Sequence, residues 1–221
     1  KHKAKSLHGQ HLILLPDRTF FWQEEQLLVV ADAHFGKAQI FREYGIPIPG
    51  GTTVDDLERL SHRIDHLQAH KVLFLGDLIH GRIENQNNLG QLIDKWRRRH
   101  KNIELLLATG NHDLRSGDPP DQFRFDRVAA EIKLGSFIFT HKPRLDSSFY
   151  GIAGHLHPAV NITGNGGLKE TLPCFCFGPR AALLPAFGSF TGTQVIRPTL
   201  EDKIYVVAGD EVVKMPNRAR L

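Results

Sequence analysis

Clusters of metal-binding side chains recur along this chain, and each follows an apolar run. The five clusters are Asp32-Ala33-His34, Gly76-Asp77, Gly110-Asn111-His112-Asp113, His141 and Gly154-His155-Leu156-His157. Together they offer imidazole nitrogens, carboxylate oxygens and an amide oxygen, but no thiolate. This mixture suits manganese, iron or zinc better than copper or an iron–sulfur centre. We therefore expect the clusters to build a metal site.

The candidate ligands are too many for a single ion. They are Asp32, His34, Asp77, Asn111, His141, His155 and His157. Two carboxylates and four imidazoles exceed what one ion with open positions would use, whereas two ions that share a bridging carboxylate would use them all. The pattern therefore predicts a dinuclear site, of the kind that cleaves phosphate esters.

The spacing of the ligands suggests how the backbone presents them. One residue separates Asp32 from His34, and one separates His155 from His157, so on an extended chain both members of a pair face the same way. We expect this spacing to let one strand end supply two ligands without distortion. Three glycines would permit the tight backbone geometry required at the strand exits. These are Gly76, Gly110 and Gly154.

Each cluster alone also has a structural interpretation. A histidine after a strand is often a hydrogen-bonded structural residue, and an aspartate after glycine is often a turn residue. Gly-Asn-His-Asp could be only a loop. Turn chemistry does not readily explain all five clusters in this order, so we favour the metal site. The thiols of Cys174 and Cys176 are too few for a closed zinc site and are expected on a buried strand face.

The elements that position the clusters can be predicted from periodicity. Helices are expected over Thr52–Ala69, capped by Thr52 or Thr53, and over Glu84–His100. Opposite the apolar stripe of the first helix, His62, His66 and His70 predict a solvated face rather than a metal site. Strands are expected over Leu12–Leu15, Thr19–Trp22, Leu27–Ala31, Val72–Leu75, Ile103–Ala108, Phe137–Thr140, Ile152–Gly154, Ala159–Thr163, Thr171–Phe177, Thr193–Ile196 and Lys203–Ala208.

This order of elements predicts an α/β protein. Alternating strands and helices in the first half favour a sheet with helical crossovers, and open sheets of this kind bind ligands at the carboxyl ends of their strands. The second half contains mostly strands. Two packed sheets with helices outside would accommodate both halves. A length of 221 residues fits one domain spanning residues 1–221.

The composition excludes a membrane-spanning protein but does not decide whether the protein binds a polyanion. Hydrophobic residues make up 41% of the chain and charged residues 24%, but the apolar runs are too short to cross a bilayer. The basic segment Lys1–Lys5 is not followed by an apolar stretch of signal-peptide length, so we expect a cytoplasmic protein, and the absence of an initial Met suggests a trimmed or partial N-terminus. A net charge of +4 is compatible with a polyanionic substrate or with solubility alone.

The five clusters, taken in order, resemble the motifs of the calcineurin-like metallophosphoesterases. The resemblance implies a four-layer α-β-β-α sandwich, in which helices flank two mixed sheets. It also implies that Asp32, His34 and His157 hold a first ion and that Asp77 bridges the two ions. The implied ligands of the second ion are Asn111, His141 and His155. In the same way, His112 is implied to lie beside the metals rather than to bind them.

A closer resemblance covers nearly the whole chain. Four segments are similar to the bacterial ligase-associated DNA damage response endonuclease family; they are Leu15–Arg18, Ala33–Lys37, Leu172–Arg180 and Leu184–Gly192. This resemblance implies a manganese-dependent DNA endonuclease that works in DNA repair beside a DNA ligase, a helicase and an exonuclease. His80 stands where many members of the broad superfamily carry aspartate, and we expect it to make a hydrogen bond around the ligands rather than to bind metal.

Physical chemistry then predicts a mechanism. A hydroxide bridging two cations would attack phosphorus in line. Because the alkoxide leaving group of DNA needs a proton, His112 is the candidate general acid, and Asp113 is the candidate for holding its ring in the cationic state. The side chains expected to meet the DNA backbone are Lys37, Arg82, Arg144 and Arg180. Fold and ligands leave open a small nucleotide, a cyclic nucleotide or a phosphoprotein as substrate, and a non-catalytic scaffold is the alternative from another class.

Overall fold

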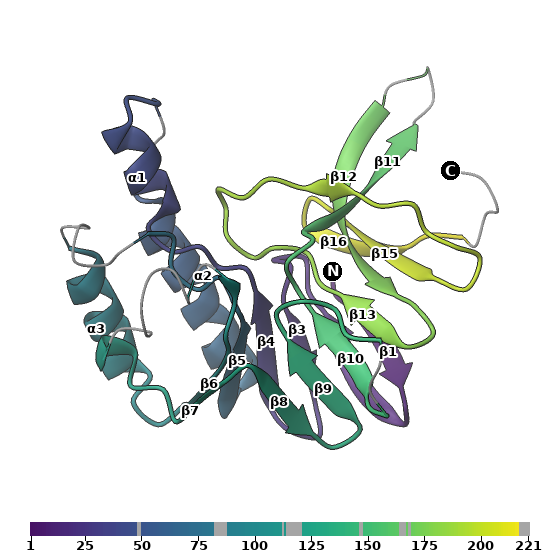
Figure 1. The fold of residues 1–221 in the computed structure, drawn as a ribbon, viewed down its shortest axis with the longest axis horizontal. Coiled ribbons are helices and arrows are strands. Elements are labelled where there is room, and N and C mark those ends of the chain that lie inside the picture. The colour runs from purple at the N-terminus through teal and green to yellow at the C-terminus, as the bar shows by residue number, and fades with distance from the viewer. Residues whose placement is uncertain are drawn as a thin grey trace.

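The fold consists of two mixed β-sheets packed face to face, with helices on the outer side of the first (Figure 1). The computed structural model describes residues 1–47, 50–81, 88–111, 113, 121–145, 148–163, 167 and 169–216. Within these residues the α/β architecture and the two mixed sheets expected from the sequence are confirmed.

The first sheet has seven strands, whose spatial order follows the sequence. They are β1 (Lys3–Leu7), β2 (Gln10–Leu14), β3 (Phe20–Trp22), β4 (Leu27–Ala31), β5 (Lys71–Leu75), β6 (Glu104–Ala108) and β7 (Arg127–Ala129). The strands from β1 to β4 pair antiparallel, and those from β4 to β7 pair parallel. Because β4, β5 and β6 are covered on both faces, they read as almost unbroken apolar runs.

The described residues contain three α-helices: α1 (Lys37–Glu43), α2 (Thr52–Leu67) and α3 (Leu89–Arg99). α2 and α3 cover the first sheet, whereas α1 extends beyond the ends of its strands (Figure 1). Leu57, Leu60 and Ile64 of α2 are buried against the sheet. His62, His66 and His70 are exposed, as the sequence predicted. The expected threonine cap is wrong, since Gly51 (φ 90°) occupies the capping position. Instead of capping α2, Thr53 Oγ1 accepts a hydrogen bond from the Gly36 amide at 3.1 Å.

The second sheet has nine strands and belongs to the second half of the chain. They are β8 (Glu131–Leu134), β9 (Phe137–Thr140), β10 (Tyr150–Ala153), β11 (Pro158–Thr163), β12 (Lys169–Phe177), β13 (Ala181–Leu183), β14 (Gln194–Val195), β15 (Lys203–Ala208) and β16 (Glu211–Lys214). β9, β10 and β13 run parallel to one another, so their carboxyl ends meet at one edge. A short 3₁₀ turn, η2 (Asp121–Phe123), precedes β7.

The main core lies between the sheets. Trp22 and Leu27 of the first sheet pack in one buried cluster with Phe137, Phe139 and Phe175 of the second. The ring centroids of Trp22 and Phe137 are 4.9 Å apart at an interplanar angle of 72°, an edge-to-face arrangement that aromatic pairs prefer. This shared core fixes the two sheets, and therefore their loops, relative to each other.

The outer side of the second sheet differs from the four-layer expectation. Cys174, Cys176 and Val206 point to this side, where the residues packed against them from outside the strands are Ile196 and Met215. In the described residues this face is thus covered by coil and carries no helix. Both cysteines are free, and burial raises the pKa of each thiol to about 12, which favours the protonated thiol over the reactive thiolate.

None of the helices in the described ranges combines the length and apolar character that crossing a lipid bilayer requires. The expected helix Glu84–His100 begins at Leu89, after Asn88 in a left-handed conformation (φ 77°), while residues 84–87 lie outside the described part of the chain.

Candidate metal centre

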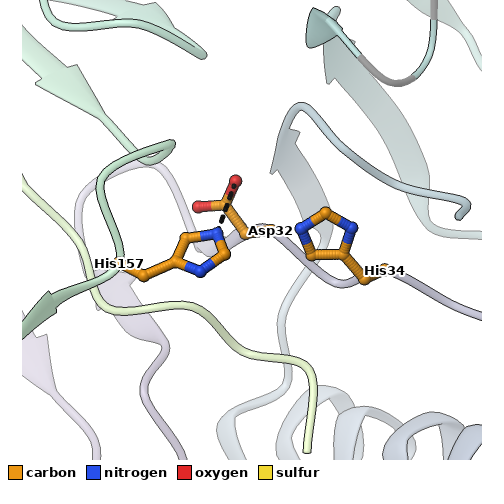
Figure 2. Close-up of side chains that lie close together, drawn as sticks. All are labelled: Asp32, His34 and His157. Carbon is orange, nitrogen blue, oxygen red and sulfur yellow. Dashed lines mark ion pairs between the residues drawn. The ribbon is translucent and has the colours of Figure 1, made fainter. Parts of the chain in front are cut away.

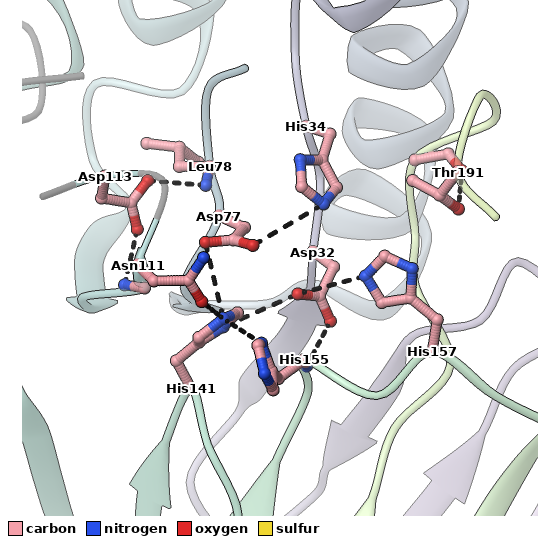
Figure 3. A network of polar contacts seen from close by, with 12 residues as sticks. Asp32, His34, Asp77, Leu78, Asn111, Asp113, His141, His155, His157 and Thr191 are labelled. Atoms are coloured by element: carbon pink, nitrogen blue, oxygen red, sulfur yellow. Dashed lines mark hydrogen bonds and ion pairs between the residues drawn. The ribbon is translucent and has the colours of Figure 1, made fainter. Parts of the chain in front are cut away.

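The predicted ligands converge where the carboxyl ends of strands from both sheets meet (Figure 3). Asp32 and His34 follow β4, and Asp77 follows β5. The remaining candidates come after β6, β9 and β10; they are Asn111, His141, His155 and His157. Because β4, β5 and β6 are parallel, as are β9 and β10, each sheet delivers its ligands to one edge.

One candidate metal position is formed by Asp32, His34 and His157, whose ligand atoms all lie within 4.8 Å of one another. His157 Nε2 is 3.5 Å from Asp32 Oδ1 (Figure 2). On the other side of the ring, Nδ1 donates a hydrogen bond of 2.9 Å to the carbonyl oxygen of Gly192. A carbonyl can only accept, so Nδ1 carries the proton and Nε2 is left to bind a cation.

The second candidate position is formed by Asp77, His141 and His155, again within 4.8 Å. His141 Nδ1 donates to the carbonyl oxygen of Leu75 at 3.0 Å, which directs Nε2 into the site. There Nε2 lies 3.1 Å from Asn111 Oδ1 and 2.9 Å from His155 Nδ1. With the proton of the ring on Nδ1, Nε2 of His141 and the amide oxygen of Asn111 are two acceptors that face each other at hydrogen-bond distance. A cation between them satisfies both.

Asp77 lies between the two positions. Its Oδ2 is 3.8 Å from His34 Nε2, and its Oδ1 is 3.5 Å from His141 Nε2 (Figure 3). Each carboxylate oxygen thus faces one of the two clusters. The carboxylate is buried, with 5% of the side chain exposed, so water alone does not compensate its charge. This is the geometry required of a bridging ligand.

The surroundings of the Asp32 carboxylate show most directly that a cation fits between the ligands. Its side chain is fully buried, and Oδ2 accepts a hydrogen bond from the His155 amide at 2.9 Å. Oδ1 has no hydrogen-bond partner among the described residues, although His157 Nε2 and His141 Nδ1 are 3.5 and 3.6 Å away. A buried carboxylate oxygen without a donor costs about 1–3 kcal/mol or more. The orphaned oxygen and the surrounding imidazoles therefore fit a pair of divalent cations.

The backbone at the ligands is not extended, which corrects the expectation from spacing. Left-handed φ angles are found at Asp32 (51°), His34 (46°), Asp77 (46°), His155 (69°) and His157 (46°). Each such conformation costs a non-glycine residue about 1–2 kcal/mol and is typical of functional sites. The strain is held by tertiary hydrogen bonds, such as those from the amides of His34 and Phe35 to the carbonyls of Asp77 and Leu78, at 2.9 and 2.8 Å.

The glycines at the strand exits are required by close approach. A Cβ atom on Gly76, which also has φ 69°, would lie 2.4 Å from His141 Nδ1. On Gly110 it would lie 2.4 Å from the Asp77 amide nitrogen, and on Gly154 it would lie 2.4 Å from Asp32 Oδ2. A side chain at any of these positions would push the ligands apart.

Two histidines have pKa values shaped by the site. Burial, together with the neighbouring His141, lowers the pKa of His155, which favours the neutral form that binds metal. Burial also acts to lower the pKa of His157, but the nearby carboxylate of Asp32 and the backbone contact with Gly192 outweigh it and raise that pKa. Asp32 thus attracts positive charge to the position where the first cation is expected.

Asp113 accepts two backbone hydrogen bonds, and its expected contact with the His112 ring stays a prediction. Its Oδ1 accepts a hydrogen bond from the Leu78 amide at 2.8 Å, and its Oδ2 accepts one from the Gly110 amide at 2.7 Å. Burial raises the pKa of this carboxyl group, although both hydrogen bonds act in the opposite direction. The side chain therefore ties the loop after β5 to the loop after β6. His112 lies outside the described residues.

The basic residues expected to bind substrate lie at different places relative to the metal ligands. Burial lowers the pKa of Lys37 although the charges of Asp77 and Asp32 oppose this shift, which puts its ammonium group within electrostatic reach of both carboxylates. Arg144 forms a 2.6 Å ion pair with Glu131, the residue that pairs with Thr140 at the end of β9. Arg180 precedes β13, at the edge of the sheet opposite the ligands. Arg82 lies outside the described residues.

Two features of the site lie around the ligands rather than among them. Gly192 contributes only a backbone carbonyl, so its contact with His157 depends on the path of the chain. The ring of His80 lies edge-on to that of His34, with centroids 5.5 Å apart, and next to Phe41 at 6.3 Å. The Gly192 contact could be found only from the fold, whereas the sequence had already indicated His80 as a neighbour of the ligands.

Comparisons with known proteins agree with the site. The model of the calcineurin-like phosphoesterase family matches residues 26–175. The crystal structure of nuclease MPE from Pseudomonas putida is 31% identical, covers 97% of this chain and 100% of that chain, and superposes with a TM-score of 0.83.

Two further solved structures match less closely. A protein of unknown function from Aquifex aeolicus is 17% identical over 59% of this chain and 78% of its own, with a TM-score of 0.40. The phosphoesterase Yfce from E. coli is 12% identical over 86% of this chain and 97% of its own, with a TM-score of 0.42. A search of curated proteins found no match.

Proposed function

Because the chain belongs to the calcineurin-like phosphoesterase family, we propose that it is a two-metal phosphodiesterase that cleaves DNA as an endonuclease. The family makes it a phosphoesterase enzyme, and the DNA substrate is the part that we propose. The observation that carries the proposal is the pair of ligand clusters on either side of Asp77, with an unpartnered buried oxygen on Asp32 among the described residues.

The proposed ligands divide into two sets around a shared carboxylate. Asp32, His34 and His157 would hold the first ion, and Asp77 would bridge. The second ion would be held by Asn111, His141 and His155. Two divalent cations bound there, manganese in our proposal, supply an activated water as nucleophile and neutralise charge on the phosphate oxygens. The hydrogen bonds from His157 and His141 to backbone carbonyls fix both rings with Nε2 toward the site.

The leaving oxygen of a DNA strand needs a proton as its bond to phosphorus breaks. We assign this proton to His112, which in sequence lies between Asn111 and Asp113, two residues at the metal centre. Lys37 is proposed to meet a phosphate near the metals, because its ammonium group lies within reach of the Asp32 and Asp77 charges. Both roles concern the substrate rather than metal binding.

Two observations support DNA as the substrate. The similar Pseudomonas putida structure is that of a nuclease and aligns with nearly the whole chain. The chain also carries a net charge of +4, which is compatible with a polyanionic substrate. Neither observation concerns partners, so an association with ligase, helicase or exonuclease stays an expectation.

The proposal is tested with supercoiled plasmid DNA and added MnCl₂. We expect the manganese-loaded protein to nick the plasmid and an Asp77→Ala variant to leave it intact, because the variant loses the carboxylate between the clusters. Parallel assays use bis(p-nitrophenyl) phosphate, cyclic nucleotides and a phosphopeptide. Hydrolysis of any of these without nicking of DNA would replace the proposed substrate while leaving the two-metal chemistry intact.

A further inference from the structure

One segment that the proposed chemistry leaves unexplained contacts both sides of the first metal position. It comprises residues 184–192, which follow β13, and is called the strap below. Its Phe187 and Gly188 amides donate to the carbonyls of Ala31 and Asp32, at 2.8 and 3.2 Å. At its other end, the carbonyl of Gly192 accepts the 2.9 Å hydrogen bond from His157. The strap thus connects a ligand of the first sheet with a ligand of the second.

The strap lies against the ligand loop so closely that one position requires glycine. A Cβ atom on Gly188 would lie 2.4 Å from the carbonyl oxygen of Ala33, between the two ligands of β4. The hydroxyl of Thr191 donates to the Gly188 carbonyl at 2.9 Å and closes the turn on itself (Figure 3). The path of the strap is therefore coupled to the position of the Asp32–His34 loop.

A buried charged residue outside the metal centre fastens the strap to helix α2. Asp56 is 4% exposed; its Oδ1 accepts the Ser189 hydroxyl at 2.5 Å and its Oδ2 accepts the Ser189 amide at 3.1 Å. Arg59, one turn along α2, pairs with Asp56 Oδ1 at 2.8 Å and donates to the Phe187 carbonyl at 2.6 Å. Its guanidinium also lies 4.1 Å from the centroid of the Phe187 ring.

The anchor places charged groups where a helix meets a loop. Taking a carboxylate out of water is costly, and burial raises the pKa of Asp56 despite the hydrogen bonds from Ser189 and the charge of Arg59. Apolar residues could join a helix to a loop at lower cost. A charged, directional contact instead fixes the strap in one position. An apolar contact would specify that position less strictly.

We propose that Asp56 and Arg59 are positioning residues, which hold the strap against Asp32 and His157 and so set the geometry of the first metal position. The inference rests on the proposed function in one respect, namely that the first cluster binds a metal ion. Partners that orient metal ligands typically contribute 10- to 100-fold in metal affinity, so loss of the anchor is expected to weaken the first position by about that factor.

The test is a titration of the metal-free full chain with MnCl₂, followed by calorimetry and by the electron paramagnetic resonance signal of free manganese. Wild type is expected to bind two ions. Asp56→Asn and, more mildly, Ser189→Ala are expected to bind one ion with unchanged affinity and the other about 10- to 100-fold more weakly. Ser61→Ala is the matched control, because it removes a buried hydroxyl of α2 that bonds to His100 at 2.8 Å, away from the strap.

The possible results separate this inference from the proposed function. If wild type binds no manganese, the proposed function fails and the anchor has no metal to position. If wild type binds two ions and both strap variants bind them equally well, the inference is wrong. It is also wrong if the strap variants lose both ions together, or if Ser61→Ala weakens the same ion, because either result would mean general destabilisation. Should Asp56→Asn not fold, Ser189→Ala alone decides.

Discussion

His112 is the residue whose role can be separated from metal binding by the choice of substrate. If it protonates the leaving oxygen, His112→Ala should lower the rate of DNA cleavage by about 10²–10⁴-fold. An activated aryl phosphodiester has a leaving group that needs no proton, so its hydrolysis should fall much less. Steady-state rates on plasmid DNA and on bis(p-nitrophenyl) phosphate check this contrast. Equal losses on both substrates would exclude the acid role.

For individual residues, the sequence could predict which side chains converge but not the backbone conformation that presents them. Residue types and their place after apolar runs were sufficient to nominate Asp32, Asp77 and His141. The left-handed conformations at Asp32 and His34 could not be predicted, because tertiary hydrogen bonds impose them against local preference. For the same reason the two hydrogen bonds that the Asp113 carboxylate accepts from backbone amides of neighbouring loops could not be predicted.

The carboxylate of Asp113 joins the loop after β5 to the loop after β6, so its removal should destabilise both loops. Asp113→Ala would leave the buried amides of Leu78 and Gly110 without their acceptor. Each unsatisfied buried donor costs about 1–3 kcal/mol. We expect a clear loss of stability in urea unfolding, with a smaller loss for Asp113→Asn, which keeps one acceptor oxygen. Stability equal to wild type in both variants would mean that other groups hold these loops.

Elements with an apolar run and clear ends could be predicted almost to the residue. The bounds of β4, β9 and β15 are those expected, and β5 and β6 differ by a residue. The sequence did not reveal α1, nor β8 and β16, which carry charged residues and are short. Such edge strands form because neighbouring strands supply hydrogen bonds, and periodicity within four residues cannot show this.

The metal centre exists only when both sheets are assembled. The core cluster that includes Trp22, Leu27 and Phe137 joins the sheets, and the ligand sets draw on both. We therefore propose that residues 1–221 form one domain and expect a single unfolding transition, with circular dichroism and tryptophan fluorescence giving the same midpoint. Manganese at about 100 times its dissociation constant should add about 2.7 kcal/mol per site to the stability. Two separate transitions would contradict the single domain.

At the scale of the whole molecule, the sequence predicted only part of the arrangement of layers. Two packed sheets with helices outside follow from the order of strands and helices in the chain, and both sheets are present. The order of elements did not indicate which residues cover the outer face of the second sheet. There Ile196 and Met215 pack against Cys174 and Val206 from coil, and isolated apolar residues in coil carry no periodic signal.

The central claim is that two cations lie on either side of Asp77, and anomalous diffraction from crystals soaked in MnCl₂ tests it most directly. The account predicts two manganese peaks about 3.5–4 Å apart. One should contact Asp32, His34 and His157, and the other should contact His141 and His155, with Asp77 reaching both. A single peak, or peaks away from these side chains, would contradict the account.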